Sequence, residues 1–325
     1  MSDWLRRVGA LFGGRTKEPV AAAHRQPTPT PAVQAGRGEP AAATALDAGP
    51  DLQARFLAWL FGDPLAGPLR DSEKRLIDRL DALIAAKDSL ASLLPRAPAV
   101  IPQLMNSLRD ERQSTGALAQ RVARDPHLVV EVIRMANSAQ ARAGAPVTDI
   151  AEAIQRLGTG GLQRAILRVV LKPMFDGQGD SLTARCTQRL WQHSEAKAEA
   201  CQHEAKVRGL DPFEGYLAGL MHNVGWTAAL RAIDRVEPRL PAQFSLAFAA
   251  AVESRRDSLF ALLALPWQLT DSLSALAAEL QHGGVAQAQS ALGQALNKAD
   301  QRASLEVLGA GSSQGTARGA APSAA

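Results

Sequence analysis

The sequence is poor in cysteine and in aromatic residues. Its two cysteines, Cys186 and Cys201, are too few and too isolated for a disulfide framework or for a zinc site of paired cysteines. We therefore expect a reducing, cytoplasmic location, with both thiols filling the core. Only 4% of the residues are aromatic, and runs of β-branched residues are short, whereas Ala, Leu, Arg and Gln are frequent. This composition predicts an all-α protein.

Long apolar runs and concentrated charge are also absent. No apolar run reaches the length that spans a bilayer, and the N-terminus lacks the continuous apolar core of a secretory signal. The net charge of +4 is divided equally between residues 1–50 and the remainder, whereas binding to a phosphate backbone requires a clustered basic face. The sequence predicts a soluble protein without a nucleic-acid partner.

Both ends of the chain have few large apolar residues. Residues 16–50 indicate a disordered Ala/Pro-rich linker, and residues 309–325 indicate a disordered tail. Residues 1–15 have two interpretations: a short amphipathic helix in peripheral contact with the anionic inner face of the membrane, or a solvated terminus. The apolar side chains of that helix would be Trp4, Leu5, Val8, Leu11 and Phe12.

Between these ends, apolar residues recur with the 3.6-residue period of amphipathic helices. Helices over 51–60 and 72–86 would form an N-terminal extension that ends at residue 92. No period of twenty to fifty residues recurs, so the pattern favours a compact bundle over a solenoid. The next helices are predicted around 104–108, at 115–124, and at 126–136 with its end at Asn137 and Ser138. A helix at 149–157 would stop at Gly158, and another would follow at 162–170. The last helices are predicted at 182–208, up to His222 with Gly225 as the stop, and around Asp300.

Six short motifs then occur in an order that resembles the HDOD domain. The likeness covers residues 93–288, and a final helix over 289–308 would complete the bundle. It implies a multi-helix bundle of HD-like type with an N-terminal helical half. The motifs are Leu94–Val100, Leu118–Pro126 and Arg134–Ala139 at the start of the domain, Val147–Gly158 in its next helix, and Leu190–Ser194 and Ala218–Gly225 in the half related to HD phosphohydrolases.

The resemblance also implies a function. HDOD proteins take part in bacterial signalling and regulation, usually without demonstrated catalysis. In HD enzymes a first histidine, a His-Asp doublet and a distant aspartate bind the metal, and the matching positions here are His193, His222, Asn223 and Asp300. Asn223 replaces the doublet aspartate, and its neutral amide holds a hard dication less well than a carboxylate does. We therefore expect a vestigial site without a cofactor, no catalysis, and partners among signalling proteins.

Other interpretations of these residues stay open. A lone histidine in a helix is more often a hydrogen-bonded core residue than a metal ligand. Conversely, the three remaining ligands could hold zinc weakly and support residual phosphohydrolysis. Arg164 and Arg168, one helical turn apart, could instead grip the phosphate of a nucleotide second messenger, although charged residues at this spacing usually face water.

Overall fold

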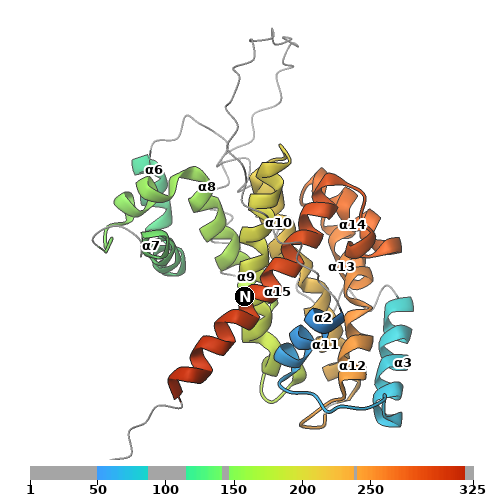
Figure 1. Ribbon diagram of the computed structural model, residues 1–325. Coiled ribbons are helices and arrows are strands. Elements are labelled where there is room, and N and C mark those ends of the chain that lie inside the picture. The colour runs from blue at the N-terminus through green and yellow to red at the C-terminus, as the bar shows by residue number, and fades with distance from the viewer. Residues whose placement is uncertain (1–49, 87–114, 141–145, 238–239, 319–325) are drawn as a thin grey trace, which may run out of the picture.

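The computed structural model describes residues 50–86, 115–140, 146–237 and 240–318, which form helices and no β-sheet (Figure 1). The predicted all-α class is therefore confirmed. The α-helices are α2 (Pro50–Phe61), α3 (Asp71–Ala85), α6 (Thr115–Val122), α7 (Pro126–Gln140), α8 (Ile150–Leu171), α9 (Leu182–Val207), α10 (Pro212–His222), α11 (Val224–Val236), α12 (Leu246–Glu253), α13 (Arg256–Ala264), α14 (Asp271–Gly283) and α15 (Ala291–Arg318).

The helices form two lobes on either side of the long helix α9. Helices α6 to α8 make the smaller lobe, and α2, α3 and α10 to α14 make the larger one, with α15 lying across α9 (Figure 1). Cys186 and Cys201 are buried in the core as predicted, and burial raises the pKa of both thiols to about 12. No helix among the described residues combines the length and the apolar character needed to cross a membrane.

Local sequence signals set several helix ends. The Asp125 carboxylate accepts hydrogen bonds from the backbone N–H groups of His127 and Leu128 at 2.9 and 3.2 Å, so it caps α7. Asp149 caps α8 in the same way. Gly158 has φ 64° and ψ −178°, a backbone conformation that is essentially restricted to glycine. The predicted stop is thus a break within α8, because helical geometry resumes directly after it.

Three predicted boundaries are wrong. Gly225 does not end a helix: it lies in the first turn of α11, where a Cβ would come within 2.1 Å of the Arg256 carbonyl oxygen, so glycine allows α11 to pack closely on α13. Helix α7 continues past Ser138 to Gln140. Helix α15 continues to Arg318 rather than residue 308, because no proline interrupts it and each added residue gains a backbone hydrogen bond.

The N-terminal extension packs on the larger lobe. Helix α2 contacts α9, α12 and α15, and α3 contacts α11 and α12. The Glu73 side chain on α3 is 1% exposed and accepts hydrogen bonds from the backbone N–H and hydroxyl of Ser245, both at 2.7 Å, and from the Arg70 N–H at 2.9 Å. These bonds join α3 to the start of α12.

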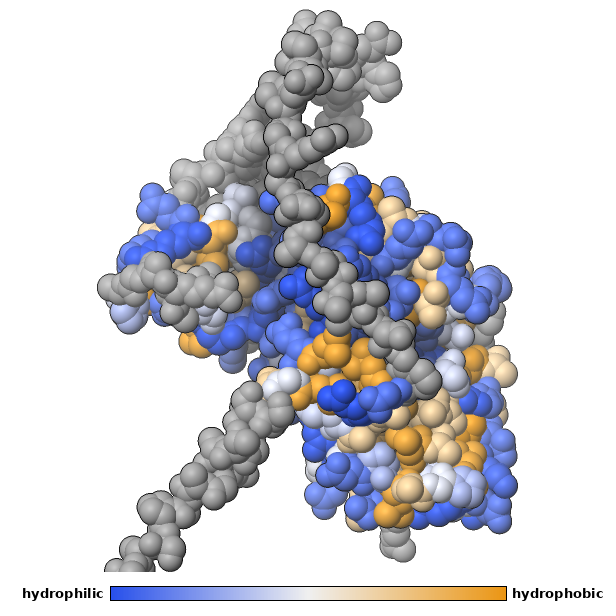
Figure 2. Space-filling view, viewed as in Figure 1, coloured by the Kyte–Doolittle hydropathy of each residue, from blue (hydrophilic) through white to orange (hydrophobic). Residues whose placement is uncertain are grey.

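The visible surface differs between the lobes. Apolar surface gathers over the larger lobe near α2 and α12, whereas the smaller lobe is mainly hydrophilic on the same face (Figure 2). The predicted membrane-contact residues 1–15, the linker up to residue 49 and the first HDOD motif lie outside the described residues.

Candidate functional site

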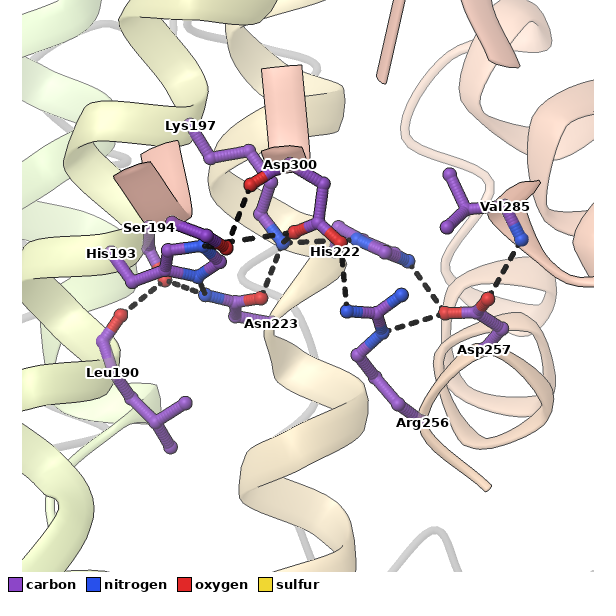
Figure 3. A network of polar contacts seen from close by, with 11 residues as sticks. Leu190, His193, Ser194, Lys197, His222, Asn223, Arg256, Asp257, Val285 and Asp300 are labelled. Carbon is purple, nitrogen blue, oxygen red and sulfur yellow. Dashed lines mark hydrogen bonds and ion pairs between the residues drawn. The ribbon is translucent and has the colours of Figure 1, made fainter. Parts of the chain in front are cut away.

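The four positions identified from the sequence meet in the interior of the larger lobe (Figure 3). His193 comes from the middle of α9, His222 ends α10, Asn223 joins α10 to α11, and Asp300 comes from α15. The Asn223 amide nitrogen lies 3.0 Å from Nδ1 of His193, and Nε2 of His193 lies 3.8 Å from Oδ1 of Asp300. Residues separated by more than a hundred positions thus share one cluster.

Glycines on α10 bring the cluster together. A Cβ at Gly219 would come within 2.7 Å of both the Ala198 Cα and the Lys197 carbonyl oxygen, and a Cβ at Gly215 would meet the Cys201 carbonyl oxygen at 2.6 Å. Because these positions lack side chains, the backbones of α9 and α10 can approach each other closely. This approach sets His222 against the face of α9 that carries His193.

Lys197 lies at the centre of the cluster and is fully buried (Figure 3). Its ammonium nitrogen lies 3.0 Å from Nδ1 of His222, 2.5 Å from Oδ1 of Asn223 and 2.7 Å from Oδ1 of Asp300. An ammonium has three N–H donors and no acceptor. Lys197 therefore uses its whole hydrogen-bonding capacity on three of the four predicted positions.

An arginine and a second aspartate extend the network toward α13. Nε2 of His222 lies 2.8 Å from Oδ1 of Asp257. The Arg256 guanidinium donates to Asp257 at 2.7 Å and to Oδ2 of Asp300 at 2.9 Å. Two cations, Lys197 and Arg256, thus face two carboxylates, so the formal charges of these four side chains cancel.

Burial and charge determine the protonation of the cluster. Burial, reinforced by the positive charge of Lys197, lowers the pKa of His193 to about 3 and that of His222 to about 4. Burial also lowers the pKa of Lys197 to about 8, although Asp300 opposes this shift. Burial disfavours the Asp300 carboxylate, but Arg256 and Lys197 together hold its pKa well below the usual range. At neutral pH the histidines are therefore neutral and Lys197 is mostly charged.

The cluster is closed to solvent. His193, Lys197, His222 and Asn223 are all 0% exposed, and the Asp300 side chain is 15% exposed. The ring of Phe56 on α2 covers His193 with the ring centroids 4.5 Å apart. Among the described residues of the network, a phosphoester could therefore approach only its edges at Asp300 and at Asp257, whose side chain is 16% exposed.

These residues do not fit a divalent metal ion. Among the four positions only Asp300 is a carboxylate, and a dication is held best where carboxylates balance its charge. Three of the four side chains already bind the Lys197 ammonium. Within the part of the chain that the structure describes, no three His, Cys, Asp or Glu side chains are arranged to hold a metal ion.

The predicted phosphate-binding pair lies elsewhere and lines a cleft of about 770 Å³ between α7, α8, α9 and α15. Arg168 is 7% exposed and pairs with Glu131 at 2.6 Å and with Glu195. Arg164 donates to the side chain of Gln202 at 3.2 Å. Arg168 is thus not on a solvated face, and a phosphate would have to displace two carboxylates, so phosphate binding at this pair remains a prediction.

Sequence reasoning did not single out Lys197, Arg256 or Asp257. Lys197 follows His193 by four positions, which places both on one face of α9, and this spacing was a usable signal. Arg256 and Asp257 begin the short helix α13, whose position depends on its packing against α11. Nothing in their local sequence marks them as partners of His222 and Asp300.

Comparisons with known proteins agree with the fold and with the motif order. The family model of the HDOD domain matches residues 94–282. An HDOD domain protein of unknown function from Geobacter sulfurreducens has a similar structure, with a TM-score of 0.52 and 23% identity, covering 73% of this chain and 80% of that one. A Shewanella amazonensis protein provisionally assigned as a metal-dependent phosphohydrolase gives a TM-score of 0.51 and 21% identity, covering 71% of this chain and 82% of that one. At these identities the two likenesses concern the fold.

A curated relative matches a shorter region. An uncharacterized protein of Treponema pallidum (strain Nichols) is 24% identical over 134 residues, which is 41% of this chain. The aligned region spans 25% of that relative.

Proposed function

Because the chain belongs to the HDOD family, we propose that it is a non-catalytic cytoplasmic module of bacterial signal transduction and regulation that acts by binding other proteins. The observation that carries this proposal is the closed, internally paired state of the cluster at the HD-type positions. Hydrolysis by metal-activated water needs an occupied site of fixed geometry that a substrate can reach. Here His193, His222 and Asn223 are fully buried and are bonded to neighbouring side chains.

The first test measures metal content and hydrolysis on the full chain. Protein purified without chelator should contain far less than one equivalent of zinc, iron or manganese by elemental mass spectrometry. It should not hydrolyse bis(p-nitrophenyl) phosphate, nucleotides or cyclic dinucleotides in the presence of Mn²⁺, Mg²⁺ or Zn²⁺. The proposal fails if metal-dependent turnover appears and is abolished by His193→Ala and His222→Ala while a surface control, Lys74→Ala, keeps it.

The second test addresses binding. Cross-linking in cells should identify a protein partner, and that partner should bind the purified full chain directly in isothermal titration calorimetry. Binding should withstand EDTA, since no metal takes part. A partner whose binding required an added divalent metal and His222 would contradict the proposal.

Two functions considered from the sequence have less support. Residual phosphohydrolysis would need His222, Asn223 and Asp300 as metal ligands, but these side chains already bind the Lys197 ammonium. Binding of a nucleotide second messenger would need the Arg168 guanidinium, which already binds the carboxylates of Glu131 and Glu195. Calorimetry with cyclic di-GMP at micromolar concentrations tests the latter directly, and we expect no heat of binding.

A further inference from the structure

The contacts of the Lys197 ammonium bear on metal binding as well as on catalysis. Its ammonium nitrogen contacts a ring nitrogen, an amide oxygen and a carboxylate oxygen, contributed by His222, Asn223 and Asp300. These atoms belong to three positions of the HD ligand set and come from the end of α10, the α10–α11 junction and α15. One positive charge therefore lies where the side chains of this set converge.

We propose that Lys197 is a built-in cation that takes the place of a metal ion, and that replacing it while restoring the carboxylate at position 223 converts the cluster into a divalent-metal site. The inference deepens the proposed function, because it explains how the fold remains stable without a metal. It concerns a binding property and requires no turnover.

Charge arithmetic supports the paired change. Lys197, Arg256, Asp257 and Asp300 carry +1, +1, −1 and −1, which sum to zero. In a Lys197→Ala/Asn223→Asp variant the cluster carries one positive and three negative charges, a net charge of −2 that one divalent ion cancels. Two neutral imidazoles and two carboxylates are also a donor set that suits zinc. Asn223→Asp alone leaves the ammonium in place, so its new carboxylate would pair with Lys197.

The experiment compares zinc uptake by the full-length chain and its variants. The wild-type protein, Asn223→Asp, Lys197→Ala and the double variant are expressed with zinc, dialysed to remove loosely bound ions, and measured by elemental mass spectrometry. Lys298→Ala is the matched control, because Lys298 is a surface lysine with its side chain 59% exposed. We expect close to one zinc per chain in the double variant, a smaller amount in Lys197→Ala, and background levels in the other three proteins.

Thermal unfolding gives a second readout. Zinc should raise the Tm of the double variant by roughly 5 to 10 °C, and EDTA should reverse the rise. A folded double variant that takes up no zinc would overturn this inference and leave the proposed function intact. Stoichiometric zinc in the wild type, lost in His222→Ala, would overturn both. If neither Lys197→Ala nor the double variant folds even with zinc, the inference also fails, since the ion should restore the charge balance.

Discussion

Protonation of the buried histidines couples the stability of the protein to pH. In the unfolded chain a histidine has a pKa near 6.5, whereas in the fold His193 and His222 have pKa values of about 3 and 4, chiefly because burial disfavours the charged ring. As the pH falls below about 6.5, the unfolded chain therefore binds protons that the folded chain does not. The stability that the two neutral histidines contribute is therefore complete above pH 6.5 and is lost progressively as the pH falls toward 4.

We expect the free energy of unfolding, measured by urea titration, to decrease between pH 7 and pH 5. Over the same range the imidazole nitrogens of His193 and His222 should keep the NMR shifts of neutral rings. His127→Gln, which removes an exposed histidine outside the cluster, serves as the control variant. Ring signals that titrate near pH 6.5 would show that the cluster is open to protons.

The packing of α9 against α10 depends on glycine. A Cβ at Gly219 would meet the backbone of α9 at 2.7 Å, so Gly219→Ala should push the two helices apart and lower the free energy of unfolding by about 1–3 kcal/mol. Gly160→Ala in α8 is the matched control. It meets nothing within 4 Å, and it should be neutral or stabilising by up to about 1 kcal/mol. Equal effects of the two substitutions in chemical denaturation would contradict this account of the helix pair.

The junction between α3 and α12 depends on one carboxylate. Glu73→Ala leaves the buried N–H and hydroxyl of Ser245 without their partner, which should cost about 1–3 kcal/mol of stability. Asp71→Ala on the same helix should change stability by less than about 0.5 kcal/mol, since the Asp71 side chain is 86% exposed. Urea denaturation of both variants measures the difference. If Glu73→Ala left the free energy of unfolding unchanged, the bonds to Ser245 would not be what holds α3 against α12.

The Glu73 junction also has its own pH signature. Burial raises the pKa of Glu73, but hydrogen bonds from Arg70 and Ser245 outweigh burial and lower the pKa to about 2. The contribution of Glu73 to stability is therefore complete above its unfolded pKa of about 4.3 and is lost as the pH falls toward 2. The Glu73→Gln variant should lack this part of the acid sensitivity.

The buried cluster includes residues from outside the region that the family model matches. Residues 94–282 omit Asp300, which binds both Lys197 and Arg256, and Phe56, which covers His193. Removing one partner of a buried ion pair typically costs about 3–5 kcal/mol. We expect a fragment of residues 94–282 to aggregate or lack a cooperative thermal transition, whereas residues 50–318 should unfold cooperatively. Circular dichroism and size-exclusion chromatography distinguish these outcomes, and a stable 94–282 fragment would show that Asp300 and Phe56 are dispensable.

Much of this architecture could be predicted from residue patterns. The 3.6-residue period and the caps at Asp125 and Asp149 are local signals, and they located most of the described helices. Motif order then identified His193, His222, Asn223 and Asp300 as one group. The central role of Lys197 could not be derived in this way, because it depends on how closely α9, α10 and α15 pack. The network through Arg256 and Asp257 likewise depends on the packing of α13, which no periodicity encodes.

The position of Asp300 after Lys197 and Arg256 in the sequence affects the order of events during protein synthesis. Lys197 and Asp300 are 103 positions apart, an interval that a ribosome translates in about 5 to 20 s. During that time Lys197 and Arg256 are already made, but the carboxylate that both of them bind is missing. The contacts that Asp300 makes with Lys197 and Arg256 can therefore form only after α15 has been made, so the buried cluster is completed late in the synthesis of this domain.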